Sequence, residues 1–275
     1  MYGALIVEPT NPEADLAVLF LHNEGYSTMC GHAIMALGRY AVDQKLVNVT
    51  EPVTPVNIEC PCGLIRAEVE VQNGKSDRVS FLSVSAFAFL TDQGIEVPGF
   101  GTVKYDIGYG GAFYALVSTK QLNLNVRTSV TRDLVDAADA ISTAVKKAVQ
   151  LSHPTSSDLA FLYGTILTDG EDHYSTDPTA NICVFADRQV DRSPTGSGVT
   201  ARIAVQYAKG QIPLGKSRVF ESVTGSLFTA TAQSELSYGP YNAVKVQVTG
   251  KANYTGESSF TLEVDDIIGR GFLLK

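Results

Sequence analysis

Two short segments, far apart in the chain, each place a small nucleophilic or hydroxyl residue directly before a glycine where a helix is expected to begin. The first reads Met-Cys-Gly-His over residues 29–32 and continues into an apolar stretch over residues 33–37. The second covers residues 191–198, with Thr195 directly before Gly196. One segment presents a thiol and the other a hydroxyl, and this asymmetry is the most informative chemical feature of the sequence.

The first segment is suited to acid–base or nucleophilic chemistry. A cysteine at a helix N-terminus lies beside unsatisfied N–H groups and the positive end of the helix dipole, which both favour the thiolate form. Gly31 would let a substrate approach the backbone closely, and His32 could donate a hydrogen bond to an anion at the same helix end. The alternative is that Cys30 is a small buried hydrophobic residue.

The second segment is suited to binding a carboxylate. The backbone N–H groups around Gly196 and Ser197 would form a nest for an anion, and Asp191, just upstream, could hold a cationic amine. The alternative is an ordinary glycine-rich turn in which Ser193 or Thr195 caps the following helix. A nucleotide-binding loop is a weaker interpretation, because the segment lacks the Lys-Ser/Thr ending of a P-loop.

Together the two segments indicate a site for a zwitterionic amino acid. Two helix N-termini would bind the carboxylate, Asp191 would bind the amine, and Cys30 would face the α-carbon. Electrostatic support of the carboxylate is what abstraction of an α-proton requires, because negative charge builds up there during the reaction.

The elements that position these segments are mostly strands. Residues 64–71 alternate apolar and charged side chains, which is typical of a half-buried strand. Strands are expected over residues 2–7, 16–21, 64–71, 79–84, 103–107, 113–117, 161–167, 182–185 and 243–248, and helices over residues 30–42, 132–150 and 199–207.

The order of these elements favours two α+β domains with a ligand cleft at their interface. A Pro/Gly-rich stretch over residues 97–101 is expected to be the linker between them. The predicted domains are therefore residues 1–100 and 101–275.

Composition limits the partners of the chain. Its 275 residues are 44% hydrophobic and carry a net charge of -8, which indicates a folded protein and argues against nucleic acid or an anionic membrane as partner. Four cysteines in a chain of this length favour a reducing, cytoplasmic compartment over a disulfide scaffold. Cys60-Pro61-Cys62 offers at most two ligands, so we expect structural thiols and no metal site.

The residues of both segments resemble the proline racemase family, whose hallmarks are Met-Cys-Gly-His and Asp-Arg-Ser-Pro-Cys-Gly-x-Gly. The stretches at 110–114 and 181–187 are also similar to family segments, and Tyr2 and Phe185 match the aromatic pair that packs on the substrate ring. The resemblance implies cofactor-independent chemistry on a small imino acid. In the racemases, each of two cysteines serves one face of the α-carbon.

The chain departs from that pattern at Thr195, which stands where the family has its second cysteine. A threonine hydroxyl cannot act as the second base. Cysteine first and threonine second resembles the trans-3-hydroxy-L-proline dehydratases of the family, which form Δ1-pyrroline-2-carboxylate. The resemblance then implies that Cys30 thiolate abstracts the α-proton and that Thr195 fills the opposite face. The alternatives are a proline or hydroxyproline racemase or epimerase, and a shortened, catalytically impaired chain that binds without turnover.

The resemblance also implies a fold and an assembly. We expect two pseudo-symmetric, diaminopimelate-epimerase-like domains, each a curled mixed sheet around a central helix, with the C-terminal segment of the second returning to the first. Family members have a further stretch before the residue matching Tyr2, so N-terminal strands of the first domain are expected to be missing here. Family members are often homodimers, which makes a homodimer the expected assembly.

Overall fold

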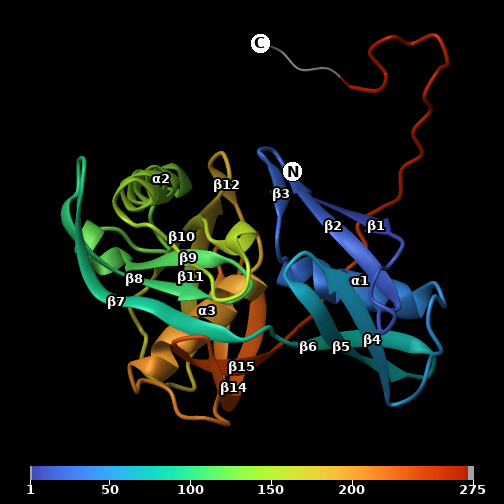
Figure 1. Cartoon of the computed structure of the whole chain (residues 1–275), viewed down its shortest axis with the longest axis horizontal. Helices are drawn as coiled ribbons and strands as arrows, with labels where there is room; N and C mark the ends of the chain where they lie inside the picture. Colours follow the sequence, from blue (N-terminus) through green and yellow to red (C-terminus); the bar gives the residue numbers. More distant parts are fainter. Residues whose placement is uncertain (1, 272–275) are drawn as a thin grey trace.

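The strands of the chain join into one mixed sheet that curls around two helices (Figure 1). The computed structural model describes residues 2–271, so Met1 and residues 272–275, at the outer ends of the two predicted domains, lie outside it. The hydrogen-bonded strand order is β1-β2-β4-β5-β6-β15-β14-β13-β11-β10-β9-β8-β7, and β3 and β12 pair with β2 and β11.

The first part of the sheet wraps one helix, α1 (Gly31–Asp43). Apolar side chains at helical spacing, including Ile34, Met35 and Leu37, pack against the inward-facing residues of β5 in one core. The strands of this part are β1 (Gly3–Val7), β2 (Leu16–His22), β3 (Gly25–Ser27), β4 (Val53–Cys60), β5 (Gly63–Gln72) and β6 (Lys75–Leu82).

The second part of the sheet closes into a barrel, because β15 pairs with β14 and β6 and also with β7. Helix α3 (Gly196–Ala208) contacts strands on several sides of this barrel, and α2 (Thr131–Ala148) packs on its outside against β10 and β7. The strands are β7 (Ala86–Val97), β8 (Gly101–Tyr109), β9 (Phe113–Ser118), β10 (Leu162–Thr168), β11 (Thr179–Phe185), β12 (Gln189–Val190), β13 (Ser217–Ser222), β14 (Leu227–Tyr238) and β15 (Tyr241–Gly250).

Close packing fixes α3 inside the barrel. A Cβ atom on Gly110 would lie 2.2 Å from the Ser197 carbonyl oxygen, and one on Gly108 would lie 2.8 Å from the Ala201 carbonyl oxygen. Both positions therefore require glycine, because any side chain would push the first turns of α3 away from β8 and the loop that follows it.

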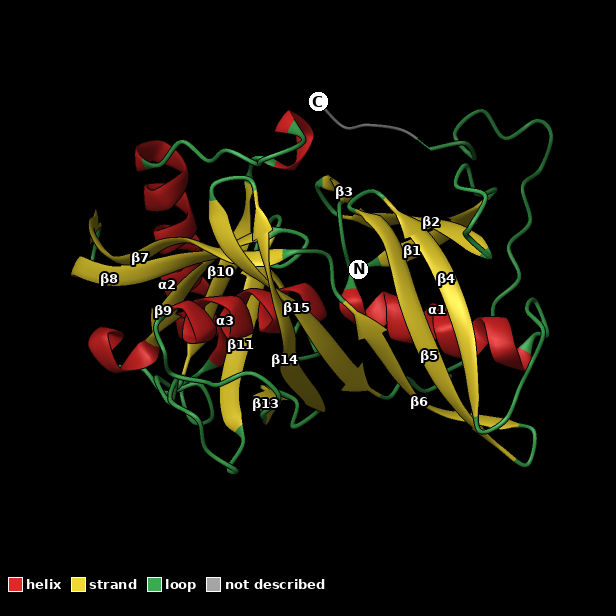
Figure 2. Ribbon diagram, turned by 60° about the horizontal axis from the view of Figure 1, so that its bottom comes forward, coloured by secondary structure: helices red, strands yellow, loops and turns green. Residues whose placement is uncertain are grey.

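The two enclosed helices lie nearly end to end across the molecule (Figure 2). Their N-termini meet, since a Cβ atom on Gly31 would lie 2.5 Å from the Gly196 Cα. Both helices are 13 residues long. The fold thus brings the starts of two segments more than 160 residues apart in sequence into direct backbone contact.

Most of the predicted elements are confirmed, and one feature of the predicted organisation is wrong. All three predicted helices and all nine predicted strands are present, with ends shifted by a few residues. The stretch at 97–101, however, is the turn of the β7–β8 hairpin, where Val97 pairs with Gly101. It is therefore not a linker, and the chain passes from the α1 part to the barrel between β6 and β7 instead.

The chain leaves the barrel after β15 and runs along the first part of the sheet. Arg39 of α1 donates a hydrogen bond to the Ala252 carbonyl oxygen at 2.5 Å and lies over the Tyr254 ring at 4.8 Å. Figure 1 shows the following residues, in red, extending past β1. Within residues 2–271, none of the helices has the length and apolar character needed to cross a membrane.

Candidate active site

The site is built where the two helix N-termini converge. Cys30 is the N-cap residue of α1, and Thr195 is the N-cap residue of α3. Among the described residues, neither side chain caps its own helix, and neither helix has an acidic residue in its first turn. Two sets of backbone N–H groups and two positive dipole ends are therefore directed at one place, which is an arrangement that binds an anion.

The thiol belongs to a chain of three polar side chains. The His32 Nε2 lies 3.4 Å from the Cys30 Sγ, and the His32 Nδ1 lies 3.4 Å from the Asp191 Oδ1 and 3.1 Å from the Ser193 Oγ. This is the geometry of a cysteine whose thiolate is paired with an imidazolium, with a carboxylate behind the ring.

The protonation of His32 follows from these neighbours. Burial alone would lower the pKa of the imidazole. The negative charge of Cys30, together with the hydrogen bond and charge of Asp191, outweighs burial and holds the pKa of His32 well above its ordinary value. His32 is therefore charged near neutral pH, and its positive charge lies beside the Cys30 sulfur.

Asp191 is buried but remains ionised. Its Oδ1 accepts a hydrogen bond from the Ser193 N–H at 2.8 Å, and its Oδ2 accepts one from the Thr195 hydroxyl at 2.9 Å. Burial works to raise the pKa of Asp191, but His32 and these two hydrogen bonds lower it below its ordinary value. Because both oxygens are engaged by the protein, Asp191 orders the site rather than facing it freely.

Thr195 is held in an unusual backbone conformation. Its φ of 68° and ψ of 99° place a β-branched residue in a region that such residues rarely adopt. The Thr195 N–H donates to the Ser193 Oγ at 3.0 Å, and the side chain is buried. The hydroxyl proton is donated to Asp191, so Thr195 has no proton-accepting role like that of an ionised thiol.

Aromatic rings cover the apolar side of the site. Phe185 lies edge-on to Tyr2, with ring centroids 5.9 Å apart, and stacks on Tyr163 at 5.3 Å. His22, at the end of β2, packs against Phe185 and Tyr163. These rings pack on one another and form an apolar wall beside the polar side chains of the site.

The structure brings every residue predicted for the site to one cavity between the helix ends. About 10 Å³ remains free at its centre, so it must open to admit a five-membered ring. The predicted residues lining it are Tyr2, Cys30, Gly31, His32, Phe185, Asp191, Thr195, Gly196 and Ser197.

Two further tyrosines line the cavity, and the sequence reasoning missed their contribution. The Tyr114 hydroxyl lies 2.8 Å from the Ser197 Oγ, which fixes the serine at the start of α3. Tyr163 stacks on Phe185. Burial raises the pKa of both phenols, so they remain neutral. Tyr114 falls in a stretch that resembles the family, whereas Tyr163 has no local signal, because only the pairing of β10 with β11 brings it to the site.

A larger cavity of about 270 Å³ lies toward the other end of α3. Gln206 and Lys209 line it together with Asp92 and Asp106, and none of its lining residues within 2–271 is a cysteine or a histidine. The smaller cavity is the candidate active site because it alone of these two combines a thiol, an imidazole and two helix N-termini.

Comparison with known proteins gives the relatives of the chain. The sequence profile of the family described as Proline racemase matches residues 1–273. The chain is 61% identical to the Trans-L-3-hydroxyproline dehydratase of Xenopus tropicalis, over 100% of this chain and 80% of that protein. It is 57% identical to the Trans-3-hydroxy-L-proline dehydratase of Homo sapiens, over 100% of this chain and 79% of that protein.

Solved structures agree with the sequence relatives. A hydroxyproline epimerase from Agrobacterium vitis with bound trans-4-OH-L-proline has a TM-score of 0.91 at 26% identity, over 98% of this chain and 77% of that chain. A probable proline racemase from Agrobacterium radiobacter, with bound carbonate, has the same TM-score and identity over 98% and 79%. The chain therefore has the proline racemase-like fold and belongs to the proline racemase family.

Proposed function

We propose that this protein is a cofactor-independent hydro-lyase that converts trans-3-hydroxy-L-proline to Δ1-pyrroline-2-carboxylate. The observation that carries the proposal is the asymmetric pair of N-cap residues: one thiol paired with an imidazolium at Cys30, and one hydroxyl bonded to a carboxylate at Thr195. The names of the relatives from Xenopus tropicalis and Homo sapiens support the same reaction.

The stereochemistry of the substrate suits a single base. In trans-3-hydroxy-L-proline the hydroxyl and the carboxylate lie on opposite faces of the ring, so the α-hydrogen and the hydroxyl share one face. Cys30 thiolate takes the α-proton, and the C–H electron pair forms the ring double bond as the C3–O bond breaks. The new thiol gives its proton to the departing hydroxide, so water leaves and the thiolate is restored. The enamine then tautomerises to the imine.

The two helix N-termini stabilise the charge that develops. The substrate carboxylate would accept hydrogen bonds from backbone N–H groups at the starts of α1 and α3, next to Gly31 and Gly196. As the α-proton leaves, negative charge spreads from the α-carbon into this carboxylate. Donors that are already oriented stabilise that charge at little cost in reorganisation.

Thr195 explains why elimination is favoured over racemisation. Inversion at the α-carbon needs an acid on the face opposite Cys30, and the Thr195 hydroxyl is already committed to Asp191. Its oxygen is left as an acceptor, which suits the ring ammonium of the substrate. We predicted that Asp191 would hold this amine; its engaged oxygens favour an indirect contribution through Thr195.

We also propose that the fold consists of two pseudo-equivalent halves that meet at the site. In support, α1 and α3 have equal length, both start at the glycine of their segment, and each lies against a curled part of the sheet. The contact of Ala252 with Arg39 supports a C-terminal segment that returns to the first half. The homodimer, the cytoplasmic location and the exclusion of nucleic acid and membrane partners stay predictions.

The test is to incubate the purified chain with trans-3-hydroxy-L-proline and trap the imine by borohydride reduction to proline. We expect loss of one water per substrate in the wild type and none in Cys30→Ser. A second arm uses L-proline in deuterium oxide. α-Deuteration with inversion, without dehydration of the hydroxy substrate, would identify a racemase or epimerase. Binding without either reaction would identify an impaired chain.

A further inference from the structure

Arg202 is a fully buried charge inside the barrel. Only 1% of its surface is exposed, and its guanidinium carbon lies 5.0 Å from the centroid of the Phe220 ring. The guanidinium donates to the Thr179 hydroxyl and to the Asn181 Oδ1, both at 3.0 Å, and to the Asp172 carboxylate at 3.1 Å. These three bonds, all from the two terminal nitrogens, fix the plane of the guanidinium, and its partners must present acceptors to it.

Asn181 passes this orientation on to the active-site loop. Arginine can only donate hydrogen bonds, so the oxygen of the Asn181 amide must face Arg202. The amide nitrogen is thereby directed at the Pro194 carbonyl oxygen, to which it donates at 3.1 Å. Asn181 is itself fully buried, so no water competes for either contact.

The bond from Asn181 holds the peptide unit that precedes Thr195. That peptide is gripped at both ends, because its carbonyl oxygen accepts from Asn181 and its N–H donates to the Ser193 Oγ. Rotation of this peptide plane would change the ψ angle of Pro194 and the φ angle of Thr195. The two hydrogen bonds therefore maintain the strained φ of 68° that lets the Thr195 hydroxyl reach Asp191.

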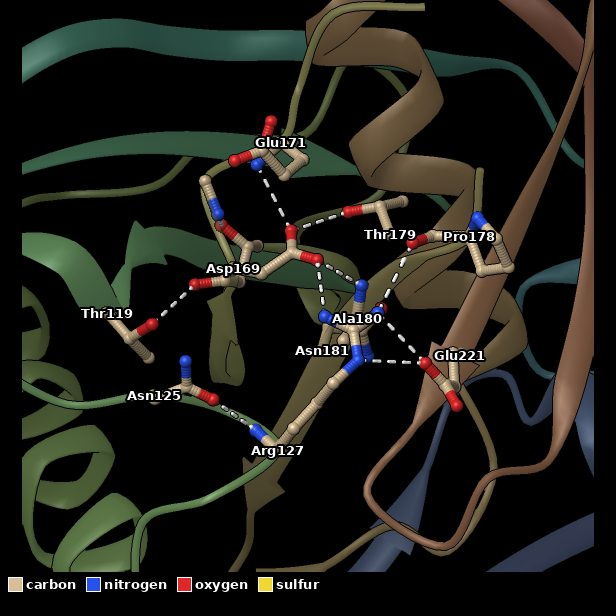
Figure 3. A network of polar contacts seen from close by, with 12 residues as sticks. Thr119, Asn125, Arg127, Asp169, Glu171, Pro178, Thr179, Ala180, Asn181 and Glu221 are labelled. Atoms are coloured by element: carbon tan, nitrogen blue, oxygen red, sulfur yellow. Dashed lines mark hydrogen bonds and ion pairs between the residues drawn. The ribbon is translucent and has the colours of Figure 1, made fainter. Parts of the chain in front are cut away.

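A network of polar contacts ties the start of β11 to its neighbours (Figure 3). The Asp169 carboxylate accepts from the Thr179 hydroxyl at 2.7 Å and from the Ala180 N–H at 2.6 Å. Arg127 bridges Asp169 and Glu221 from the side. The start of β11, which carries Asn181, is thus fixed to the loops around it.

We propose that Asn181 and Arg202 are positioning residues, which act on the reaction through the Pro194–Thr195 peptide without touching substrate. The kinetic part of this inference rests on the proposed dehydratase function. The structural part does not, because it concerns the geometry of the loop and of Cys30 opposite it.

The decisive variant is Asn181→Asp, with Thr165→Val as the matched control. Aspartate has the shape of asparagine and still accepts a hydrogen bond from Arg202. It cannot donate to the Pro194 carbonyl, and its second carboxylate oxygen would repel that carbonyl oxygen. Thr165, on the neighbouring strand β10, is equally buried. Thr165→Val removes its hydroxyl contact with the Ser142 Oγ at 2.8 Å and leaves the bonds of Arg202 and Asn181 intact. We expect kcat on trans-3-hydroxy-L-proline to fall at least about tenfold in the first variant and to stay within about twofold in the second.

A readout without turnover separates this inference from the proposed function. Loosening of Thr195 frees Asp191, which orders His32 against Cys30. The pH dependence of Cys30 alkylation by iodoacetamide should therefore change in Asn181→Asp and not in Thr165→Val. If the wild type proves inactive on the hydroxyproline, the alkylation contrast still decides. Equal behaviour of the two variants in both assays, or equal losses that follow their thermal stability, would overturn the inference.

Discussion

The contact between the two helix N-termini predicts how much activity is lost when Gly31 is replaced by alanine. In Gly31→Ala, the new methyl group would lie 2.5 Å from the Gly196 Cα and 3.1 Å from the Phe81 ring. Ordinary contact begins near 3.4 Å, so the helix starts must separate by about 0.9 Å. Both sets of N–H groups would then be misplaced with respect to one carboxylate, and a misplacement of about 1 Å costs about 100-fold in rate. We expect kcat/KM to fall by about that factor.

Gly38→Ala is the matched control, because it lies on the same helix away from the site. Its methyl group would meet the Val79 and Val69 side chains at 3.2 and 3.3 Å, which can adjust. Gly38→Ala, in the helix interior, gains about 1 kcal/mol of helix propensity, against about 1–3 kcal/mol of overpacking. It should therefore keep activity on trans-3-hydroxy-L-proline even if its thermal midpoint falls, whereas Gly31→Ala loses activity while still folded. A Gly31→Ala enzyme within about threefold of the wild type would refute the reasoning that the meeting of the helix ends creates the site.

Three further substitutions test the polar groups. Cys30→Ser should lower kcat about 100- to 10,000-fold, because a hydroxyl is not ionised near neutral pH; turnover close to wild type would exclude the thiolate as base. Thr195→Cys should give slow deuterium exchange with inversion on L-proline, measured by mass spectrometry and chiral chromatography. Absence of exchange would contradict the placement of residue 195 on the face of the α-carbon opposite Cys30. Asp191→Asn should move the alkaline limb of the pH–rate profile to lower pH, because the carboxylate helps to raise the pKa of His32. The free energy of unfolding that Asp191 and His32 contribute should be present between about pH 4 and pH 6.5. It should be lost as pH rises through the raised pKa of His32 or falls through the lowered pKa of Asp191. Urea unfolding of wild type and Asp191→Asn across pH measures it.

Local pattern explains why so much of the fold was predictable. The strict alternation in β5 and the apolar spacing in α1 each depend on one face of one element, and the structure buries those faces. The hairpin at 97–101 was misjudged because a Pro/Gly cluster marks a turn and a linker equally well. Only the pairing of Val97 with Gly101 distinguishes the two, and that pairing depends on strands further along the barrel.

The membership of the site was predictable, but its internal connections were not. Each helix start carries its own signal in sequence, so Cys30 and Thr195 could be found separately. The contact of His32 with Asp191 joins residues 159 positions apart, and no spacing rule indicates it. Asn181 and Arg202 were missed for the same reason: a polar residue in a strand or helix interior gives no sign that its partner is a loop carbonyl.

The groups at the two helix N-termini show how a hydroxyl at Thr195 can stand where the racemase pattern has a thiol. At α1, the N-cap side chain is the thiol of Cys30, and His32 lies 3.4 Å from its sulfur. At α3 the N-cap residue carries no charge, and the nearby negative charge is that of Asp191, to which Thr195 donates its proton. The racemase pattern combines an aspartate at this position with a second cysteine, so Asp191 alone does not decide the number of bases. The hydroxyl of Thr195, bonded to Asp191, leaves Cys30 as the one base that the proposed same-face elimination requires.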